Sequence, residues 1–535
     1  MSRTASTRRV SKDKGGGSAK ARDKAQPPSP TVEIPPGARG KPAPKKTAPP
    51  AAKAGGDAGE KVAGKAVAKA GGGRLKRRNF ASFDSASKWL AARPNVERTR
   101  PSRVPADAFK LDRMRALAGL LGDPHLACPV VHVAGSKGKG SVVEMAASCL
   151  SACGYATGVF TSPHLVTVRE RVRVGNELIT EKEFTRLLGK VAAAAQALEA
   201  THGEVTYFEA VTALGFLHFA EQAVDCAVVE VGLGGRLDCT NIVEPSVCVV
   251  TAIQLEHTEL LGSTIGAIAS EKAGIFKAGS PAITLGQDES VMSAFREAAE
   301  RAGCELRVLK EHVEFSSRFE ASPELGPHVR VCLSSPRSSY EHLPVPLPGE
   351  HQAENCGLAL AVLDALRAQG FELPERDVAR GLALTPSNGR MEIVHERPRV
   401  MIDGAHNPES VRALVRAIGA HQRTDSMVVV FGCAADKDAN GMLREIALGA
   451  DKIVFTKAED SPRAMDPAEL QKRFVELSGK MAQVEPSLKS ALNTAARAVG
   501  RDDLICVTGS FHLAGEAKRL LLEKRARQAT PTTGA

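Results

Sequence analysis

Short apolar runs alternate with longer stretches of helical periodicity from about residue 104 onward. Four apolar-rich runs predict strands at 130–135, 155–162, 223–232 and 247–253. Helical spacing of apolar positions predicts helices at 142–154, 179–198, 206–223 and 357–370. The second of these helices opens with the Thr180–Glu183 spacing of a capping box. Strands that are almost wholly apolar are expected in a parallel sheet covered on both faces, so the pattern indicates an α/β fold.

A second alternation follows the turn-forming segment TPSNGR at 385–390. It predicts four more strands, with helices between them, at 399–404, 426–433, 452–457 and 504–510. We therefore expect two α/β domains, at 81–386 and 387–522, joined at this Pro/Ser/Asn/Gly segment. The two ends of the chain, 1–80 and 523–535, are predicted to be tails.

The net charge of +10 at pH 7 comes from the first 80 residues. They contain 20 Lys and Arg against 5 Asp and Glu, whereas residues 81–535 contain 51 against 56. Because this first segment is rich in Ala, Gly and Pro and poor in large apolar side chains, we expect a disordered basic tail. Loose contact with polyanions and a targeting signal in MSRTASTRRV are the alternatives for it. The mildly acidic remainder argues against a specific nucleic-acid-binding protein.

The sequence shows neither a membrane span nor a secretory signal. No run reaches the ~18 apolar residues that a membrane helix needs. The eleven cysteines are scattered, mostly inside apolar runs, and none forms a CxxC pair. We therefore expect reduced cysteines in the core of a cytoplasmic protein, and neither a disulfide framework nor a cysteine metal site.

A glycine-rich loop follows the first predicted strand and leads directly into a helix. In GSKGKGS, Gly135, Gly138 and Gly140 allow a tight turn and close approach of the backbone to a ligand. Lys139 can place its ammonium at the β- and γ-phosphates of a nucleotide, and the Ser141 hydroxyl can ligate Mg²⁺. Gly140 separates these two side chains, which are adjacent in the common pattern. The strand–loop–helix context nevertheless favours a phosphate-binding loop over a plain turn.

Nine segments occur in one order along the chain: HVAGSKGKGS, TSPHL, TYFEAVTALGF, EVGLGGRLDCTN, LEHTELLG, EKAGIFK, PGEHQAEN, DGAHNP and GSFHLAGE. They resemble the motifs of folylpolyglutamate synthase and dihydrofolate synthase, a family within the Mur ligase superfamily, and the resemblance covers most of 104–520. It implies a P-loop parallel-sheet domain at 81–386 and a smaller Rossmann-like glutamate ligase domain at 387–522.

Three residues depart from the family pattern. Ser136 and Lys137 stand where Thr and Asn are usual, and Glu256 stands where Asp is usual. The additional cation at Lys137 is expected to favour phosphate binding or to alter how the loop opens. Glu256 displaces its carboxylate by about one methylene relative to Asp.

The resemblance also implies a Mg²⁺ site formed by Ser141, Ser162, Glu230 and His257. Glu230 ends an apolar strand, where the ligand sites of α/β sheets gather, and a buried ion pair is the alternative for it. His257, taken alone, is more often structural than a ligand. Lys272, taken alone, is typical of a solvated helix residue. The matching lysine of the family carries a carbamate, which forms from the neutral amine and provides an anion for a second Mg²⁺.

The segment TYFE opens a predicted helix and, taken alone, is typical of an aromatic core patch. The resemblance assigns seven residues to a dihydropteroate site: Thr206, Tyr207, Phe208, Glu209, Leu237, Asp238 and Cys239. An upstream segment near Ala106–Phe109 is a further expected pterin contact.

Three residues of the second half match ATP-contacting positions of the family: Asn355, Arg390 and Asp403. Asn can bind an adenine edge, Arg390 offers a fork of donors to phosphate, and Asp403 follows a strand where it can accept from a ribose hydroxyl. An interdomain salt bridge is the alternative for Arg390. We expect His406, in the same DGAHNP motif as Asp403, to face the cleft and help position glutamate.

These residues together predict an ATP-dependent ligase that adds L-glutamate to dihydropteroate, to reduced folates or to both, through an acyl phosphate. Lys139 and Mg²⁺ are expected to stabilise charge, while domain closure excludes water. By resemblance the protein is a monomer whose partners are small molecules. A Mur-type ligase for cell-wall precursors, a P-loop NTPase without ligase activity, and a polyanion-binding protein acting through its tail stay open as alternatives.

Overall fold

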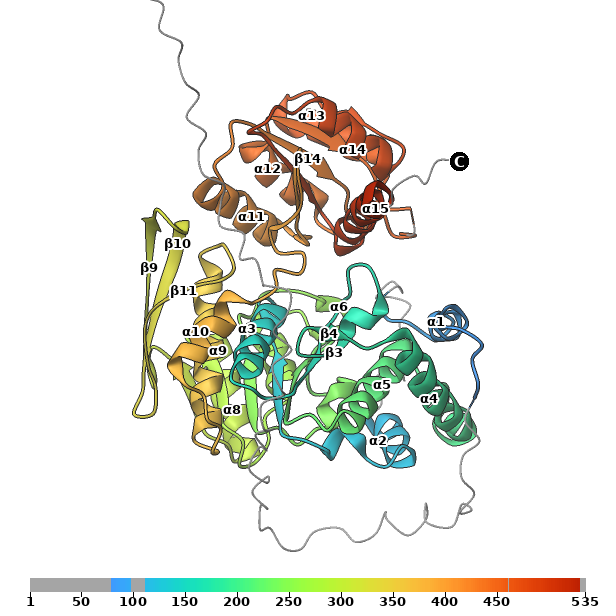
Figure 1. Ribbon diagram of the computed structural model, residues 1–535, viewed down its shortest axis with the longest axis vertical. Helices are drawn as coiled ribbons and strands as arrows, with labels where there is room; N and C mark the ends of the chain where they lie inside the picture. Colours follow the sequence, from blue (N-terminus) through green and yellow to red (C-terminus); the bar gives the residue numbers. More distant parts are fainter. Residues whose placement is uncertain (1–77, 98–110, 460, 530–535) are drawn as a thin grey trace, which may run out of the picture. The chain divides into compact units, whose positions relative to one another are not determined.

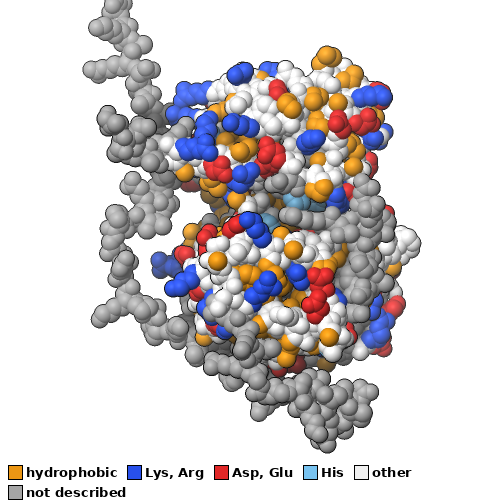
Figure 2. Space-filling model, turned by 90° about the vertical axis from the view of Figure 1, so that its right-hand side faces the viewer, with side chains coloured by type: hydrophobic (Ala, Val, Ile, Leu, Met, Phe, Trp, Pro, Cys, Tyr) orange, Lys and Arg blue, Asp and Glu red, His pale blue; other side chains and the backbone are white. Residues whose placement is uncertain are grey.

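The computed structural model describes residues 78–97, 111–459 and 461–529 (Figure 1). Most of the predicted basic tail, the segment Ala106–Phe109 and the last six residues lie outside the described residues. In the described part of the chain, no helix has both the length and the apolar character needed to cross a membrane. On the face shown in Figure 2, basic and acidic side chains lie close to one another, as the nearly balanced composition of 81–535 leads us to expect.

The first domain is built on an eight-stranded sheet with the strand order β4-β3-β2-β5-β1-β6-β7-β8. Its strands are β1 Val130–Ala134, β2 Thr157–Phe160, β3 Val172–Val174, β4 Glu177–Leu178, β5 Cys226–Glu230, β6 Val247–Val250, β7 Ala282–Leu285 and β8 Leu306–Leu309. The run from β2 to β8 is parallel, and β1, β2, β5, β6 and β7 consist entirely of buried residues. The parallel sheet predicted from apolar runs is thereby confirmed, whereas its strands β7 and β8 and the antiparallel edge strands β3 and β4 were not predicted.

Helices cover both faces of this sheet (Figure 1). One face carries α3 Lys139–Ala152, α9 His351–Arg367 and α10 Glu375–Ala383. The other carries α1 Phe83–Ala91, α2 Leu111–Leu120, α4 Glu181–His202, α5 Tyr207–Glu221, α7 Ile265–Ala273 and α8 Glu289–Ala302. Val131 of β1 packs into the first core and Val130 into the second, because successive side chains of a strand point to opposite faces. Short helical turns complete the domain at η3 Pro124–Leu126, η4 Val168–Arg171, η5 Cys239–Ile242 and α6 Thr258–Leu261.

The helix starts follow from local chemistry. Thr180 caps α4 as predicted: its side chain accepts from the Glu183 amide at 3.2 Å, and the Glu183 carboxylate accepts from the Thr180 amide at 3.2 Å. The helix predicted at 142–154 begins earlier, at Lys139, because Gly138 serves as its N-cap with a φ of 91°. The glycine-rich loop and the first turn of α3 are therefore continuous, which places backbone amides at the loop.

A three-stranded antiparallel sheet lies beside α9 in the order β11-β10-β9. Its strands are β9 Glu314–Ser322, β10 Gly326–Ser334 and β11 Ser339–Pro344. This sheet was not predicted, because most side chains of β9 are exposed and polar and give no apolar run. Phe315 attaches the sheet to the domain: a β-carbon on Gly357 of α9 would lie 2.6 Å from its ring.

The second domain has a six-stranded sheet in the order β12-β13-β17-β14-β15-β16. Its strands are β12 Glu392–Glu396, β13 Arg399–Ile402, β14 Met427–Phe431, β15 Lys452–Phe455, β16 Gln483–Val484 and β17 Leu504–Thr508. Its helices are α11 Pro408–His421, α12 Ala439–Gly449, α13 Pro467–Ser478, α14 Leu488–Arg497 and α15 Phe511–Ala529. The four predicted strands are the parallel strands β13, β14, β15 and β17. The last helix continues to Ala529, past residue 522 where the second tail was expected, and Glu523 there pairs with Arg519 one turn earlier.

All eleven cysteines are free thiols. Eight of them are buried, and three are partly exposed: Cys128, Cys304 and Cys332. Six of the buried thiols belong to the first domain, whereas Cys433 and Cys506 belong to the core of the second. The expectation that most cysteines lie in the core agrees with the burial of these eight.

Candidate active site

One cavity of about 840 Å³ is lined by residues of both α/β domains. The twenty residues singled out from the sequence all line it: Gly135, Gly138, Lys139, Gly140, Ser141, Ser162, Thr206, Tyr207, Phe208, Glu209, Glu230, Leu237, Asp238, Cys239, His257, Lys272, Asn355, Arg390, Asp403 and His406. Several follow the carboxyl ends of parallel strands, which is where α/β sheets bind ligands. The structure therefore brings these twenty predicted site residues into one cavity.

The glycine-rich loop is held tightly against the end of β6. Gly135 has a φ of 142°, and a β-carbon there would lie 1.8 Å from the Thr251 hydroxyl, so no larger residue fits. That hydroxyl donates to the Lys137 carbonyl at 2.6 Å. The Lys139 ammonium donates to the Gly135 carbonyl at 3.0 Å. The loop is thus compact, with its lysine folded back onto its own backbone.

Two of the predicted nucleotide contacts lie directly on this loop. A β-carbon on Gly138 would lie 2.2 Å from the Asn355 carbonyl oxygen, and one on Gly140 would lie 2.2 Å from an Arg390 guanidinium nitrogen. Arg390 donates to the Asn388 carbonyl at 3.4 Å, and it makes no ion pair with any residue that the structure describes. The interdomain salt bridge that was the alternative for Arg390 is therefore not observed, and its guanidinium is directed to the phosphate loop.

The four predicted Mg²⁺ ligands offer a donor set that suits this ion. Glu230 is 5% exposed, and its carboxylate accepts from the Ser162 amide at 3.0 Å. Burial raises the pKa of Glu230, and the charges of Lys139 and Arg390 oppose that rise. Burial lowers the pKa of His257 to about 4, which leaves a neutral imidazole for coordination. Two hydroxyls, one carboxylate and one imidazole form an oxygen-rich set that fits Mg²⁺.

This donor set depends on its hydroxyls. Between residues 78 and 529, leaving out those that the structure does not describe, no three His, Cys, Asp or Glu side chains gather to hold a metal ion. Ser141 lies fully buried in the first turn of α3, beside the phosphate loop. A cation bound here would consequently lie against the loop, where nucleotide phosphates are expected.

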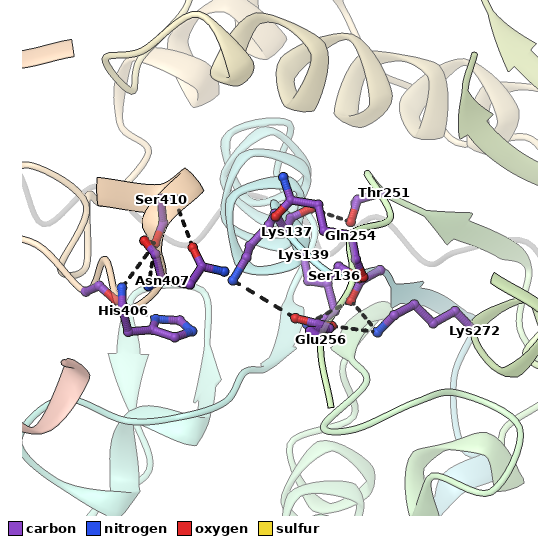
Figure 3. Close-up of polar contacts among 12 residues, drawn as sticks. Ser136, Lys137, Lys139, Thr251, Gln254, Glu256, Lys272, His406, Asn407 and Ser410 are labelled. Atoms are coloured by element: carbon purple, nitrogen blue, oxygen red, sulfur yellow. Dashed lines mark hydrogen bonds and ion pairs between the residues drawn. The ribbon is translucent and has the colours of Figure 1, made fainter. Parts of the chain in front are cut away.

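Lys272 is buried, contrary to the solvated helix position that its local sequence suggested. Its side chain is 2% exposed, and its ammonium donates to Glu256 at 2.9 Å and to the Gly135 carbonyl at 3.0 Å (Figure 3). Burial lowers the pKa of Lys272 to about 8, against the opposing charge of Glu256. Burial alone would raise the pKa of Glu256, but the charges of Lys272, Lys139 and Lys137 outweigh it and lower that pKa to about 2. Two lysines and the loop backbone thus meet around one carboxylate.

The TYFE segment forms the start of α5 and one wall of the cavity. The Glu209 carboxylate accepts from the Arg113 guanidinium at 2.9 Å and from the Thr206 amide at 2.8 Å. The Arg171 guanidinium lies 5.4 Å from the Tyr207 ring centroid and 6.0 Å from that of Phe208. TYFE is therefore both a helix start and an aromatic wall, and its Glu209 is already held by internal partners.

The loop after β5 forms the neighbouring wall. Asp238 is buried, and its carboxylate accepts from the Leu233 amide at 2.9 Å and from the Thr240 amide at 3.0 Å. Burial raises the pKa of Asp238 and that of the Cys239 thiol, whose sulfur lies 3.2 Å from the Thr212 hydroxyl. Leu237 is 38% exposed and lines the cavity, as do Val231 and Leu233 of the same loop.

The second domain contributes Asp403 and His406 to the opposite wall. Asp403 accepts from the Met391 amide at 2.9 Å and from the Ala405 amide at 2.8 Å, and burial raises its pKa to about 6. Burial, with a smaller effect of Lys137, lowers the pKa of His406 to about 4. The His406 ring lies 5.8 Å from the Phe511 ring and is neutral at physiological pH.

One charged network in the cavity was missed from the sequence. Arg171 is 1% exposed, pairs with Glu97 at 2.6 Å and donates to His164 at 2.9 Å. Arg463 of the second domain donates to the Glu97 carbonyl at 3.1 Å. The partners are far apart in the chain, so only the alternation of arginine and valine in RVRV could have indicated a buried charge. This network joins the wall around Tyr207 to the second domain.

Comparison with known families gives two matches along the chain. The family described as Mur ligase middle domain matches residues 133–363, and the family described as Mur ligase, glutamate ligase domain matches residues 389–511. The interval between the two matches contains the segment at 385–388 where the sequence predicted a domain boundary.

Known proteins resemble the chain over most of its length. The dihydrofolate synthase/folylpolyglutamate synthase of Bacillus subtilis is 32% identical over 446 residues, covering 83% of this chain and 100% of the relative. The structure of Mycobacterium tuberculosis folylpolyglutamate synthase complexed with ADP matches at a TM-score of 0.74 and 31% identity, covering 82% of this chain and 98% of that one. The structure of Escherichia coli FolC in complex with DHPP and ADP matches at a TM-score of 0.72 and 30% identity, covering 84% of this chain and 100% of that one.

Proposed function

The chain belongs to the folylpolyglutamate and dihydrofolate synthases of the Mur ligase superfamily, and from this we propose that its cavity joins L-glutamate to the carboxyl group of a pteroate or folate. It is an ATP-dependent ligase. The observation that carries the assignment is the convergence of the phosphate loop, Asn355 and Arg390 with the aromatic wall of Tyr207 and Phe208 in one cavity. The expected triphosphate and pterin sites would thereby share one cavity.

The first step activates the acid. A carboxylate oxygen of the pterin substrate attacks the γ-phosphorus of ATP, the bond to the β–γ bridging oxygen breaks, and ADP leaves with that electron pair. Lys139 and Arg390 would stabilise the phosphoryl charge from the two sides of the loop. Ser141, Ser162, Glu230 and His257 would hold Mg²⁺, which when bound neutralises phosphate charge.

The second step forms the amide. The amine of L-glutamate attacks the carbonyl carbon of the acyl phosphate, inorganic phosphate leaves, and the amine loses its proton. The neutral His406 would position the incoming glutamate at the second-domain wall. Because water would hydrolyse the acyl phosphate, the enclosure of the cavity by both domains protects this intermediate.

We also propose that Lys272 carries the carbamate known from its family. Its pKa of about 8 supports this, since about a tenth of the amine is then neutral at pH 7 and able to add CO₂ with loss of a proton. The carbamate would replace the attraction between Lys272 and Glu256 with two neighbouring anions and provide a site for a second Mg²⁺. Intact-mass measurement with and without bicarbonate, repeated on Lys272→Arg, checks the modification.

The location, the domain limits and the oligomeric state of the protein are further proposals. The eleven free thiols support a cytoplasmic location, where glutathione keeps cysteines reduced. The domain limits 81–386 and 387–522 agree with the two family matches. A monomer is expected by family resemblance, and light scattering of the purified protein checks it.

The deciding experiment is ADP release by the purified protein with MgATP, L-glutamate and either 7,8-dihydropteroate or tetrahydrofolate. Turnover that needs both glutamate and dihydropteroate establishes the synthase step, and turnover with both pterins establishes two activities. Reactions without glutamate and with Lys139→Ala are the controls. ADP release that neither pterin stimulates contradicts the folate assignment, and stimulation by a peptidoglycan precursor instead favours the cell-wall alternative.

A further inference from the structure

A second lysine of the glycine-rich loop, Lys137, is not used by the mechanism above. Its backbone is fixed, because its amide donates to the Ala252 carbonyl at 3.2 Å and its carbonyl accepts from the Thr251 hydroxyl at 2.6 Å. Its side chain leaves the loop toward the cavity, which it lines, and is 25% exposed. The loop therefore presents two ammonium groups to the same volume.

Lys137 has only a loose partner in the structure. Its ammonium lies 4.0 Å from the Glu256 carboxylate, farther than a hydrogen bond, whereas the other oxygen of Glu256 is engaged by Lys272 at 2.9 Å (Figure 3). Burial lowers the pKa of Lys137, with opposing effects from Glu256 and Glu409 and reinforcing effects from Lys139 and Lys437. Charged groups of both domains thus face this ammonium. The cations among them favour the binding of an anion here.

Glu256 and Lys137 together are two of the three departures from the family pattern, and they contact each other. An Asp at 256 would be shorter by about one methylene, so the longer Glu256 is what brings a carboxylate near both Lys137 and Lys272. Lys139 and Lys272 both donate to the Gly135 carbonyl, at 3.0 Å each, which leaves Lys137 as the lysine of this cluster with no hydrogen bond to that carbonyl.

We propose that Lys137 is a further catalytic residue, which binds the γ-phosphoryl group of ATP and stays with it during transfer to the substrate carboxylate, with Glu256 as its resting partner. This inference rests on the proposed function. When ATP enters, Lys137 exchanges the loose contact with Glu256 for charge-assisted hydrogen bonds to phosphate oxygens, while Glu256 stays with Lys272. No covalent bond to Lys137 forms, and the γ-phosphoryl group passes from ATP to the carboxylate oxygen, with ADP as the leaving group, as described above.

Titration calorimetry with ADP and with a methylene-bridged ATP analogue tests this directly. Lys137→Asn, which introduces the residue usual in the family, is compared with Lys137→Arg, with the wild type and with Lys190→Asn on α4. Lys190 pairs with Glu221 at 2.6 Å, lies outside the cavity and controls for the loss of one positive charge. Each titration is run with Mg²⁺ and again with EDTA, and thermal unfolding checks that every variant is folded.

We expect Lys137→Asn to weaken binding of the ATP analogue by about tenfold or more, while ADP affinity changes less than about twofold. Lys137→Arg should keep most of the analogue affinity, and Lys190→Asn should bind both nucleotides like the wild type. The selective loss should persist in EDTA, since the contact is between lysine and phosphate.

Three results would overturn the inference: equal losses for ADP and the analogue, an unchanged analogue affinity in Lys137→Asn, or a selective loss that disappears in EDTA. Failure of the proposed function looks different, because the wild type itself would then bind neither nucleotide or release no ADP in response to glutamate and a pterin.

Discussion

Burial shifts the pKa of several residues around the cavity, among them Lys272, Asp403 and His406. Lys272 illustrates why the sequence alone misplaced one of them: its segment EKAGIFK has the charges of a surface helix, but Glu256 and the Gly135 carbonyl satisfy its ammonium inside the protein. Those partners come from other elements, so the local periodicity of the sequence cannot predict them. By contrast, Glu230 was predictable as a buried carboxylate, because it lies within an unbroken apolar run.

Asp403 is expected to make nucleotide binding dependent on pH, since it is a predicted ATP contact with a raised pKa. Its pKa is raised to about 6, so its folded form binds protons more readily than an unfolded aspartate, and its contribution to stability is present at low pH and lost as pH rises to about 6. Its proposed hydrogen bond from a ribose hydroxyl needs the carboxylate, which exists above that pH. We expect ADP affinity to fall as pH is lowered through about 6, measured by calorimetry between about pH 5 and pH 8.

The matched variant for this prediction is Asp403→Asn, which removes the titrating group and keeps the side-chain size. Its ADP affinity should vary much less over the same pH range. An equally steep pH dependence in that variant would assign the titration to another group.

Glu209 is expected to be a structural residue as well as part of the pterin wall. Glu209→Gln removes the carboxylate opposite Arg113, and both side chains are nearly inaccessible to water. Loss of one partner of a buried pair costs about 3–5 kcal/mol, which urea unfolding should detect. Glu289→Gln, at the exposed pair with Arg296, is the control and should leave stability almost unchanged. Equal midpoints for Glu209→Gln and the wild type would contradict the structural role.

At the scale of elements, the predictions that succeeded rest on one local sequence pattern. Several of the strands that were missed depend on pairing with other parts of the chain. The strand, loop and helix from Val130 to Ala152 follow from an apolar run, three glycines and a helical repeat. The sheet β9–β11 does not, because its strands are stabilised by each other and by one face of α9, so their outer residues are polar. The antiparallel β3 escaped prediction for the same reason, since its pairing with β2 depends on a partner element.

Contact between α3 and α10 requires a glycine. A β-carbon on Gly381 would lie 2.5 Å from the Cys149 α-carbon and 2.7 Å from the Ser148 carbonyl, both of them backbone atoms of α3. Gly381→Ala should therefore separate the helices and destabilise the protein by about 1–3 kcal/mol in urea unfolding.

The control is Gly419→Ala near the end of α11, where a β-carbon meets nothing within 4 Å. Because alanine favours helix over glycine, this change should be neutral or slightly stabilising, by up to about 1 kcal/mol. Comparable losses in both variants would show that helix contact is not what Gly381 provides.

For the molecule as a whole, the composition of the site was predictable and its geometry was not. The motifs that carry the resemblance supplied residues from both domains, and all of them line the same cavity. Their spacing gave no means to find that Asn355 and Arg390 lie on the phosphate loop, or that Arg463 binds the Glu97 carbonyl. Such contacts depend on how two separately folded sheets are joined, which no local pattern records.

The ligase function should not need the basic N-terminal segment. Every predicted site residue, including the expected pterin contact near Ala106–Phe109, lies after residue 105, so a protein that starts near Arg78 should keep the kcat of the full chain in the ADP-release assay, within about twofold. Binding of both forms to heparin at several salt concentrations is the companion measurement. A large loss of kcat in the shortened protein would instead favour a role of the basic segment in catalysis.

The distribution of cysteines gives this protein its own set of chemical reporters. A maleimide or iodoacetamide reagent should reach Cys128, Cys304 and Cys332 most readily while the chain is folded, because the other eight thiols are buried, with Cys239 and Cys433 at the wall of the cavity. Mass spectrometry of digested, pulse-labelled protein would then give the time at which each core opens. Cys433 and Cys506 report on the second domain, and Cys149, Cys226 and Cys356 report on the first. The natural sequence thus allows the order in which the two cores unfold to be followed without introducing any label site.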